Sequence, residues 1–128
     1  MASSVWTRFS TAFAGFLGLC GVATGAAGAH GGGGGLASLA STFFLVHAAA
    51  LLGLCVQSER FGSGARLCRL AAVVLGLGTL LFAGDVATVG LTGAHVVRGL
   101  APTGGTLLLI GWALVIVAPI RDSFGRGN

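Results

Sequence analysis

The sequence predicts an all-α integral membrane protein, a four-helix transmembrane bundle with both termini on the inner side of the membrane. Hydrophobic residues make up 55% of the 128 residues and charged residues 8%, and the mean hydropathy is +0.97. Soluble domains do not have this composition. Four apolar stretches are long enough, at about 18 residues or more, to cross a hydrocarbon core of about 30 Å. Within a single domain of residues 1–128, they cover 9–29, 36–56, 69–92 and 103–120.

The arginines predict the orientation of these segments. Every cation in the chain is an arginine, and the loops expected on the outer side contain Arg98 alone. Since loops on the cytoplasmic or matrix side carry the excess of positive charge, both termini should face that side. A net charge of +4 spread over the whole chain also excludes a nucleic-acid footprint. The arginines expected on the inner side are Arg8, Arg60, Arg66, Arg69, Arg121 and Arg126.

The first segment, 9–29, carries glycines on one broad face, because they are spaced by three or four residues. Small residues let transmembrane helices approach closely, so we expect this face to be the helix-packing surface of the segment. A general bias of the chain toward glycine and alanine is the alternative explanation. The glycines concerned are Gly15, Gly18, Gly21, Gly25 and Gly28.

The same segment also resembles a secretory signal that ends in the small residues 27–29. Removal of this segment would leave three helices and would spoil the regular distribution of charge. We therefore expect the segment to be retained as the first transmembrane helix.

The connections have distinct compositions. His30 and the glycines at 31–35 predict a flexible turn, and no phosphate-loop lysine accompanies them. The second connection, between the segments 36–56 and 69–92, is polar and basic. Its arginines Arg60, Arg66 and Arg69 could contact anionic lipid headgroups.

The fourth segment, 103–120, is expected to begin near Pro102, which suits the first turn of a helix, and to end at Pro119. Trp112 should lie near the bilayer centre, where its indole N–H requires a partner in another helix. Trp6 should lie at the inner membrane interface. Glycines expected to pack the third and fourth segments together are Gly90, Gly104, Gly105 and Gly111.

His47 is an ionisable residue in the middle of the second segment, about 16 Å from Leu36 along a helix. Such a residue is a candidate functional site. It could be a neutral imidazole bonded to another helix, for example to Thr79 or to a backbone carbonyl. It could instead relay protons or bind a cofactor. Haem held by two histidines is disfavoured and no cofactor is expected, because His30 and His95 should lie at the outer interface.

Asp85 interrupts the third segment near its outer end. We expect it to pair with Arg98 or His95 and so to fix the third connection. A metal site formed by His30, Asp85 and His95 is chemically permissible, since imidazole and carboxylate suit zinc, but these residues lack a spacing motif and no metal is expected. Cysteines 20, 55 and 68 show no CxxC pattern and are expected to be packing residues.

Three blocks resemble a known family. Residues 26–31, AAGAHG, resemble the signature that closes the first helix of the YgdD-like membrane proteins, the family called domain of unknown function 423. Residues 47–53, HAAALLG, are similar to the His-x-x-Ala-Leu-Leu-Gly of its second helix. Residues 100–112, LAPTGGTLLLIGW, resemble the eukaryotic branch, transmembrane protein 256. The chain departs from the family at 81–85, LFAGD, where a tyrosine is missing. The resemblance implies four transmembrane helices, no established activity and a mitochondrial location.

These observations predict a small non-enzymatic membrane protein, because the chain has few catalytic groups and no GxSxG motif. We expect an accessory or assembly subunit of a larger complex, with a respiratory complex of the mitochondrial inner membrane as the first candidate rather than one of the bacterial inner membrane. Its partners would be other membrane-protein subunits and lipids, not nucleic acid. The alternative is a small oligomeric transporter or an ion or proton conductor in which His47 and Asp85 line the path. A cofactor-binding redox protein is the weakest of the three hypotheses.

Overall fold

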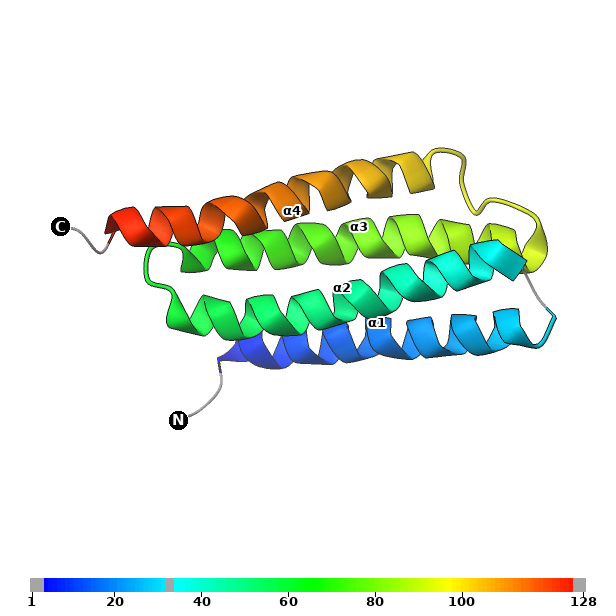
Figure 1. The fold of residues 1–128 in the computed structure, drawn as a ribbon, viewed down its shortest axis with the longest axis horizontal. Coiled ribbons are helices and arrows are strands. Elements are labelled where there is room, and N and C mark those ends of the chain that lie inside the picture. Colours follow the sequence, from blue (N-terminus) through cyan, green and yellow to red (C-terminus); the bar gives the residue numbers. More distant parts are fainter. Residues whose placement is uncertain (1–3, 32–33, 126–128) are drawn as a thin grey trace.

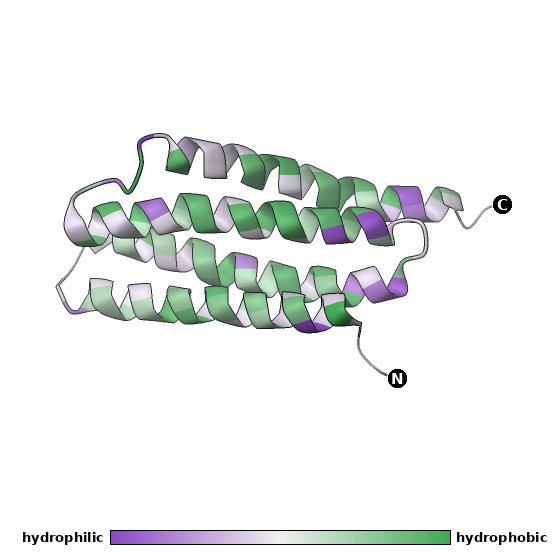
Figure 2. Cartoon of the chain, turned by 180° about the vertical axis from the view of Figure 1, so that it is seen from behind, coloured by the Kyte–Doolittle hydropathy of each residue, from purple (hydrophilic) through white to green (hydrophobic). Residues whose placement is uncertain are grey.

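The computed structural model describes residues 4–31 and 34–125. Four helices cover these residues, and no strand occurs among them: α1 is Val5–Ala29, α2 is Gly34–Arg60, α3 is Ala65–Thr92 and α4 is Leu100–Gly125. All four are long and apolar enough to cross a membrane. Hydrophobic residues follow the length of each helix (Figure 2). The predicted all-α, four-helix membrane fold is confirmed.

The helices form an open bundle in which each helix packs against the next one in the sequence (Figure 1). A small contact also joins α1 to α3, whereas within the described residues α4 packs its backbone against α3 and against no other helix. Neighbouring helices run antiparallel. Both termini and the α2–α3 connection lie at one end of the molecule, and the α1–α2 and α3–α4 connections lie at the other (Figure 1).

The core is built from leucines and small residues. Leu17, Leu51 and Leu75, one from each of the first three helices, are fully buried, and alanines fill the spaces between the backbones. Large apolar side chains such as Leu19 and Leu109 face outward. This distribution suits a lipid environment, because lipid tails give no hydrophobic driving force for association and helices must associate through close packing.

The glycines of α1 bring it against α2, but not along the whole predicted face. A Cβ atom on Gly21 would lie 2.7 Å from Leu45 Cγ, and one on Gly28 would lie 2.9 Å from Ala37 Cβ. A Cβ on Gly25 would likewise lie close to α2, 2.8 Å from Ser41 Oγ, whereas one on Gly18 would lie 4.0 Å from Ala48 Cβ. The expectation for Gly15 is wrong, because a Cβ there would meet no atom within 4 Å. Gly15 therefore faces away from α2, whereas nearer the termini Thr7 of α1 and Glu59 of α2 are hydrogen-bonded to each other.

Glycines also bring α3 and α4 together. A Cβ on Gly104 would collide with the backbone nitrogen of Phe82, and one on Gly111 would lie 2.6 Å from Leu75 Cγ. Gly105 is less enclosed, with Phe82 Cδ2 at 3.9 Å. The backbones of α3 and α4 can approach this closely because these positions lack side chains.

Pro119 does not end the fourth helix, contrary to the prediction. Helix α4 continues through it to Gly125. Proline is tolerated inside membrane helices because neighbouring groups satisfy the freed backbone. Pro119 cannot donate to the carbonyl of Val115 four residues earlier. The turn that follows is held by the hydroxyl of Ser123, which donates to the Pro119 carbonyl at 3.0 Å, and by Asp122, which accepts the N–H of Gly62 in the α2–α3 connection. Pro102 lies in the first turn of α4, as predicted.

The turn after α1 is shorter than expected. His30 caps α1, and Gly31 has a φ of +105°, which glycine adopts without strain. Helix α2 already begins at Gly34, so Gly34 and Gly35 belong to its first turn. Residues 32 and 33 of the predicted turn lie outside the described residues.

Candidate functional site

A hydrogen-bonded chain at mid-membrane centres on His47, which is 5% exposed. Its Nδ1 lies 2.8 Å from the carbonyl oxygen of Phe43, one turn earlier in α2. The indole Nε1 of Trp112, from α4, lies 3.3 Å from His47 Nε2. Because an indole nitrogen only donates, Nε2 must accept and Nδ1 must carry the hydrogen that is donated to Phe43. A single neutral tautomer of His47 thus satisfies both ring nitrogens.

Aromatic rings surround this chain. The His47 and Trp112 rings meet edge to face with their centres 5.9 Å apart, and Phe43 stacks on His47 at 5.6 Å. Phe82 of α3 adds a further ring, 4.5 Å from Phe43. The aromatic cluster of Phe43, His47, Phe82 and Trp112 therefore joins three helices.

The predicted partner Thr79 is not bonded to His47. Its hydroxyl donates instead to the carbonyl of Leu75 in its own helix, at 2.7 Å. Sequence reasoning placed His47 and Trp112 at the same depth but did not pair them. That equality of depth, in two helices that start from the same side of the membrane, was the signal that could have identified the bond.

A groove runs between α2 and α4, and Trp112 divides it into two parts. The part toward the α3–α4 connection, here called the outer part, has a volume of about 390 Å³. The part toward the end that carries the termini, here called the inner part, has a volume of about 210 Å³. The outer part contains the His47 ring. The inner part is lined by smaller and more polar residues, namely Ala50, Gly53, Leu54 and Gln57 of α2 and Val115 of α4.

Asp85 holds the α3–α4 connection, as predicted from its position. Its carboxylate, 1% exposed, lies 2.8 Å from His95 Nδ1, and it accepts the backbone N–H of Val96 at 3.3 Å. The structure thus pairs Asp85 with His95 rather than with Arg98. His30 does not join them, and no three His, Cys, Asp or Glu side chains of the described residues gather as metal ligands. The candidate set of His30, Asp85 and His95 is therefore not assembled.

Two further acids have roles that sequence reasoning missed. Asp122 of α4 is buried, and its Oδ1 accepts the N–H groups of Gly62 and Gly64 at 2.8 and 3.3 Å. Glu59 at the end of α2 accepts hydrogen bonds from Ser4 and Thr7 at 3.0 and 2.6 Å. Both acids lie beside arginines in the sequence, and no local pattern distinguishes them from solvated charges. All three carboxylates of the chain thus hold element ends together.

The arginines gather as their spacing predicted. Arg60, Arg66 and Arg69 are exposed at the end of the bundle that carries both termini, whereas Arg98 lies at the opposite end. Many of the hydrophilic residues gather at the terminal end (Figure 2). Arg126 lies outside the described residues. The three cysteines 20, 55 and 68 are free thiols.

Comparison with known proteins agrees with this architecture. The family described as "Protein of unknown function (DUF423)" matches residues 24–105. The UPF0382 inner membrane protein YgdD of Escherichia coli strain K12 and its namesake from Shigella flexneri are each 37% identical over 75 residues. The match covers 59% of this chain and 56% of the relatives, so the chain spans little more than half their length. No solved structure gives a significant match. The chain is a small multi-pass membrane protein and belongs to the DUF423 family, as its sequence motifs predicted.

Proposed function

We propose that this chain is a non-enzymatic accessory or assembly subunit of a larger membrane complex, and that the inner part of the α2–α4 groove receives a transmembrane helix of a partner subunit. The observation that carries the proposal is Gly53. This glycine is exposed on α2, and a Cβ there would meet no atom within 4 Å, so nothing in the described part of the chain uses the close approach that it permits.

The residues around Gly53 support a helix as the occupant. Ala49, Gly53 and Gln57 are spaced by four residues, lie on one face of α2 and are all exposed. Small residues at this spacing let two membrane helices pack closely, and a side-chain amide can hydrogen-bond across their interface. The groove thus offers small side chains that permit close packing, and the amide of Gln57 lies near the inner end of the span.

The conductor hypothesis has less support from the geometry. Both ring nitrogens of His47 have partners inside the protein, and the Asp85 carboxylate is bonded to His95 and to the backbone of Val96. A proton path through either residue would have to break these bonds first. Conduction through His47 or Asp85 would therefore require both sites to rearrange.

We propose the mitochondrial inner membrane as the location and a respiratory complex as the partner. The support is the resemblance of residues 100–112 to the eukaryotic branch of the family. The relatives found by comparison are named as bacterial inner membrane proteins, so the location needs its own measurement. Fractionation of cells that express the tagged chain should place it with inner-membrane markers.

The test is native electrophoresis of source membranes in mild detergent, followed by mass spectrometry of the band that contains the chain. Wild-type protein should migrate with a large complex. Gly53→Leu should shift most of the protein to the position of a monomer or small oligomer. Gly15→Leu is the matched control, because Gly15 is equally free of contacts but lies on α1.

Two results would overturn the proposal. If Gly53→Leu still migrates with the large complex, the groove is not the contact surface. If the wild-type protein itself migrates as a monomer or small oligomer, the subunit hypothesis fails. Flux measurements on His47→Ala and Asp85→Asn in vesicles would then test conduction.

A further inference from the structure

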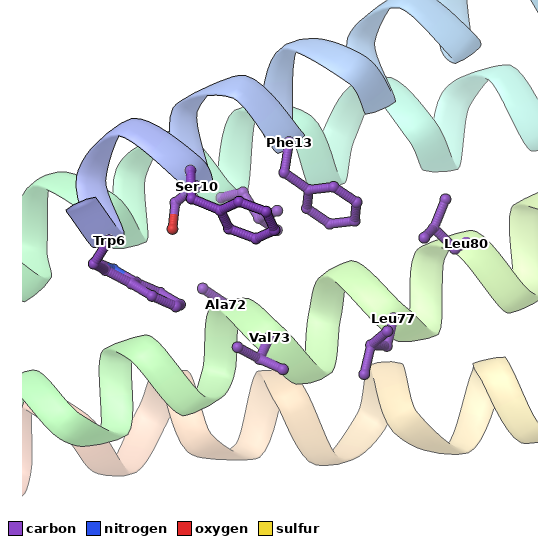
Figure 3. Close-up of a pocket in the computed structure, with 9 residues that line it drawn as sticks. Trp6, Ser10, Phe13, Ala72, Val73, Leu77 and Leu80 are labelled. Atoms are coloured by element: carbon purple, nitrogen blue, oxygen red, sulfur yellow. The ribbon is translucent and has the colours of Figure 1, made fainter.

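A second groove lies between α1 and α3 and has a volume of about 170 Å³. Figure 3 shows Trp6 and Phe13 of α1 facing Val73, Leu77 and Leu80 of α3 across it. Its walls are large and apolar, unlike those of the inner α2–α4 groove. Because close packing of a protein helix needs small residues, these walls fit a thin flexible chain better than a helix.

The length of the groove matches one leaflet of a bilayer. Arg69, Val73 and Leu77 follow one another at spacings of four residues and so share one face of α3. From Ala72 to Leu80, the α3 residues that line the groove, the helix rises about 12 Å. Arg69 lies a further turn toward the termini, and half of a hydrocarbon core is about 15 Å. The groove therefore runs from the headgroup level on the terminal side to about the middle of the membrane.

A polar group marks the headgroup end of the groove. The indole Nε1 of Trp6 is buried and has no acceptor among the described residues. Buried donors without an acceptor are uncommon in proteins. The Trp6 indole lines the groove (Figure 3), and it could therefore donate to an oxygen of a molecule that occupies the groove.

Positive charge lies at the same end. Arg69 is exposed one turn before Val73, at the mouth of the groove. The nearest acid is Glu59 at the end of α2, which is bonded to Ser4 and Thr7 on either side of Trp6. Arg66 is exposed a further turn outward. The two arginines outnumber Glu59, so the mouth of the groove favours an anion.

We propose that this groove binds one acyl chain of an anionic phospholipid from the leaflet on the side of the termini. The chain lies along Phe13 and Leu77, a glycerol ester carbonyl accepts the Trp6 N–H, and the phosphate faces Arg69. Because a tail gains little from leaving bulk lipid, the selectivity comes from the carbonyl and the phosphate. Basic pockets between membrane helices recognise anionic headgroups in this way.

The test is native mass spectrometry of the purified full-length protein titrated with phosphatidylglycerol or phosphatidylcholine of identical acyl chains. Wild-type protein should bind one phosphatidylglycerol more tightly than phosphatidylcholine. Arg69→Gln should weaken phosphatidylglycerol binding about fivefold and remove this preference. Trp6→Phe should weaken both lipids about equally, since both carry the ester carbonyl. Arg98→Gln and Trp112→Phe are the controls and should change neither affinity.

A second measurement, made on the wild-type protein, tests the proposal even if the variants fail to fold. Phosphatidylglycerol with a photoreactive diazirine in its acyl chain should label wild-type peptides that contain Phe13 and Leu77 above those from other lipid-facing surfaces. The proposal is overturned if labelling is uniform over the exposed apolar faces, if the two lipids bind equally, or if the control variants lose as much affinity as Arg69→Gln.

Discussion

The hydrogen bond between His47 Nε2 and Trp112 Nε1 joins two helices, α2 and α4, whose backbones do not pack against each other in the described part of the chain. It spans the groove between them at mid-membrane. Because His47 also donates to the Phe43 carbonyl in its own helix, the bond ties the partly exposed side chain of Trp112 to α2. The hydrogen bond between the two side chains therefore sets the separation of α2 and α4.

A double-mutant cycle should measure the coupling free energy between His47 and Trp112. His47→Leu and Trp112→Phe each remove one partner, and their effects on the free energy of unfolding should be non-additive by about 0.6 kcal/mol and by no more than about 1.7 kcal/mol, the range known for hydrogen bonds in membranes. Reversible unfolding in mixed micelles gives the values. A cycle of His47→Leu with Trp6→Phe is the control and should show no coupling. Additive effects in the His47–Trp112 cycle would mean that the bond contributes nothing to stability.

Loss of the Asp85 carboxylate should loosen the α3–α4 connection. Asp85→Ala leaves the N–H of Val96 and the ring of His95 without their acceptor, which should cost about 1–3 kcal/mol of unfolding free energy. Hydrogen exchange of the amides at 93–97 should become faster. Asp85→Asn keeps an acceptor for Val96, so its effect should be smaller. Arg98→Gln, which alters a charge that does not pair with Asp85, should leave exchange unchanged, and an equal effect of all three variants would contradict this assignment.

Two glycines of α1 should differ sharply in their tolerance of a large side chain. Gly21→Leu places a side chain where Leu45 already lies, and overpacking of this kind costs about 1–3 kcal/mol or more. Gly15→Leu extends into open space and should change the free energy of unfolding little. Both variants can be compared by unfolding in mixed micelles. Equal destabilisation would show that α1 packs in a different register.

The arginine distribution predicts which side of the membrane each connection faces. In a chain whose native cysteines have been replaced, Val97→Cys should react with a membrane-impermeant maleimide added from outside the inner membrane. Ser63→Cys should react only after the membrane is permeabilised. Both positions lie in exposed connections at opposite ends of the bundle. The reverse pattern would place the termini on the outer side.

The helices were predictable from sequence because exposed polar groups are costly in hydrocarbon, so uninterrupted apolar segments identify the spans. Their ends were less predictable. Proline usually kinks or ends a helix because it lacks a backbone N–H and its ring crowds the carbonyl four residues earlier, but membrane helices tolerate it more often. At Pro119 the helix continues, and Ser123 and Asp122 anchor the turn that follows.

The candidate site was predictable in its parts and not in its pairing. His47 and Trp112 were each recognised as polar groups at mid-membrane that require partners. Their bond depends on how α2 and α4 turn toward each other beside α3, which no local pattern encodes. Thr79 was an incorrect partner because a threonine in a helix can satisfy its hydroxyl with the carbonyl four residues earlier. Asp122 was missed because its burial depends on the amides of a distant connection.

The open arrangement of the helices has a consequence for how the protein is made. Every extensive interface joins helices that are adjacent in the sequence, so each helix can pack on its predecessor while the ribosome is still synthesising the next. The glycine contacts between α1 and α2 can be complete before α3 leaves the ribosome. Loop-closure entropy is small for such local pairs. The chain can therefore assemble in the order of its translation, and the bond from Trp112 to His47 is the step that waits for the last helix.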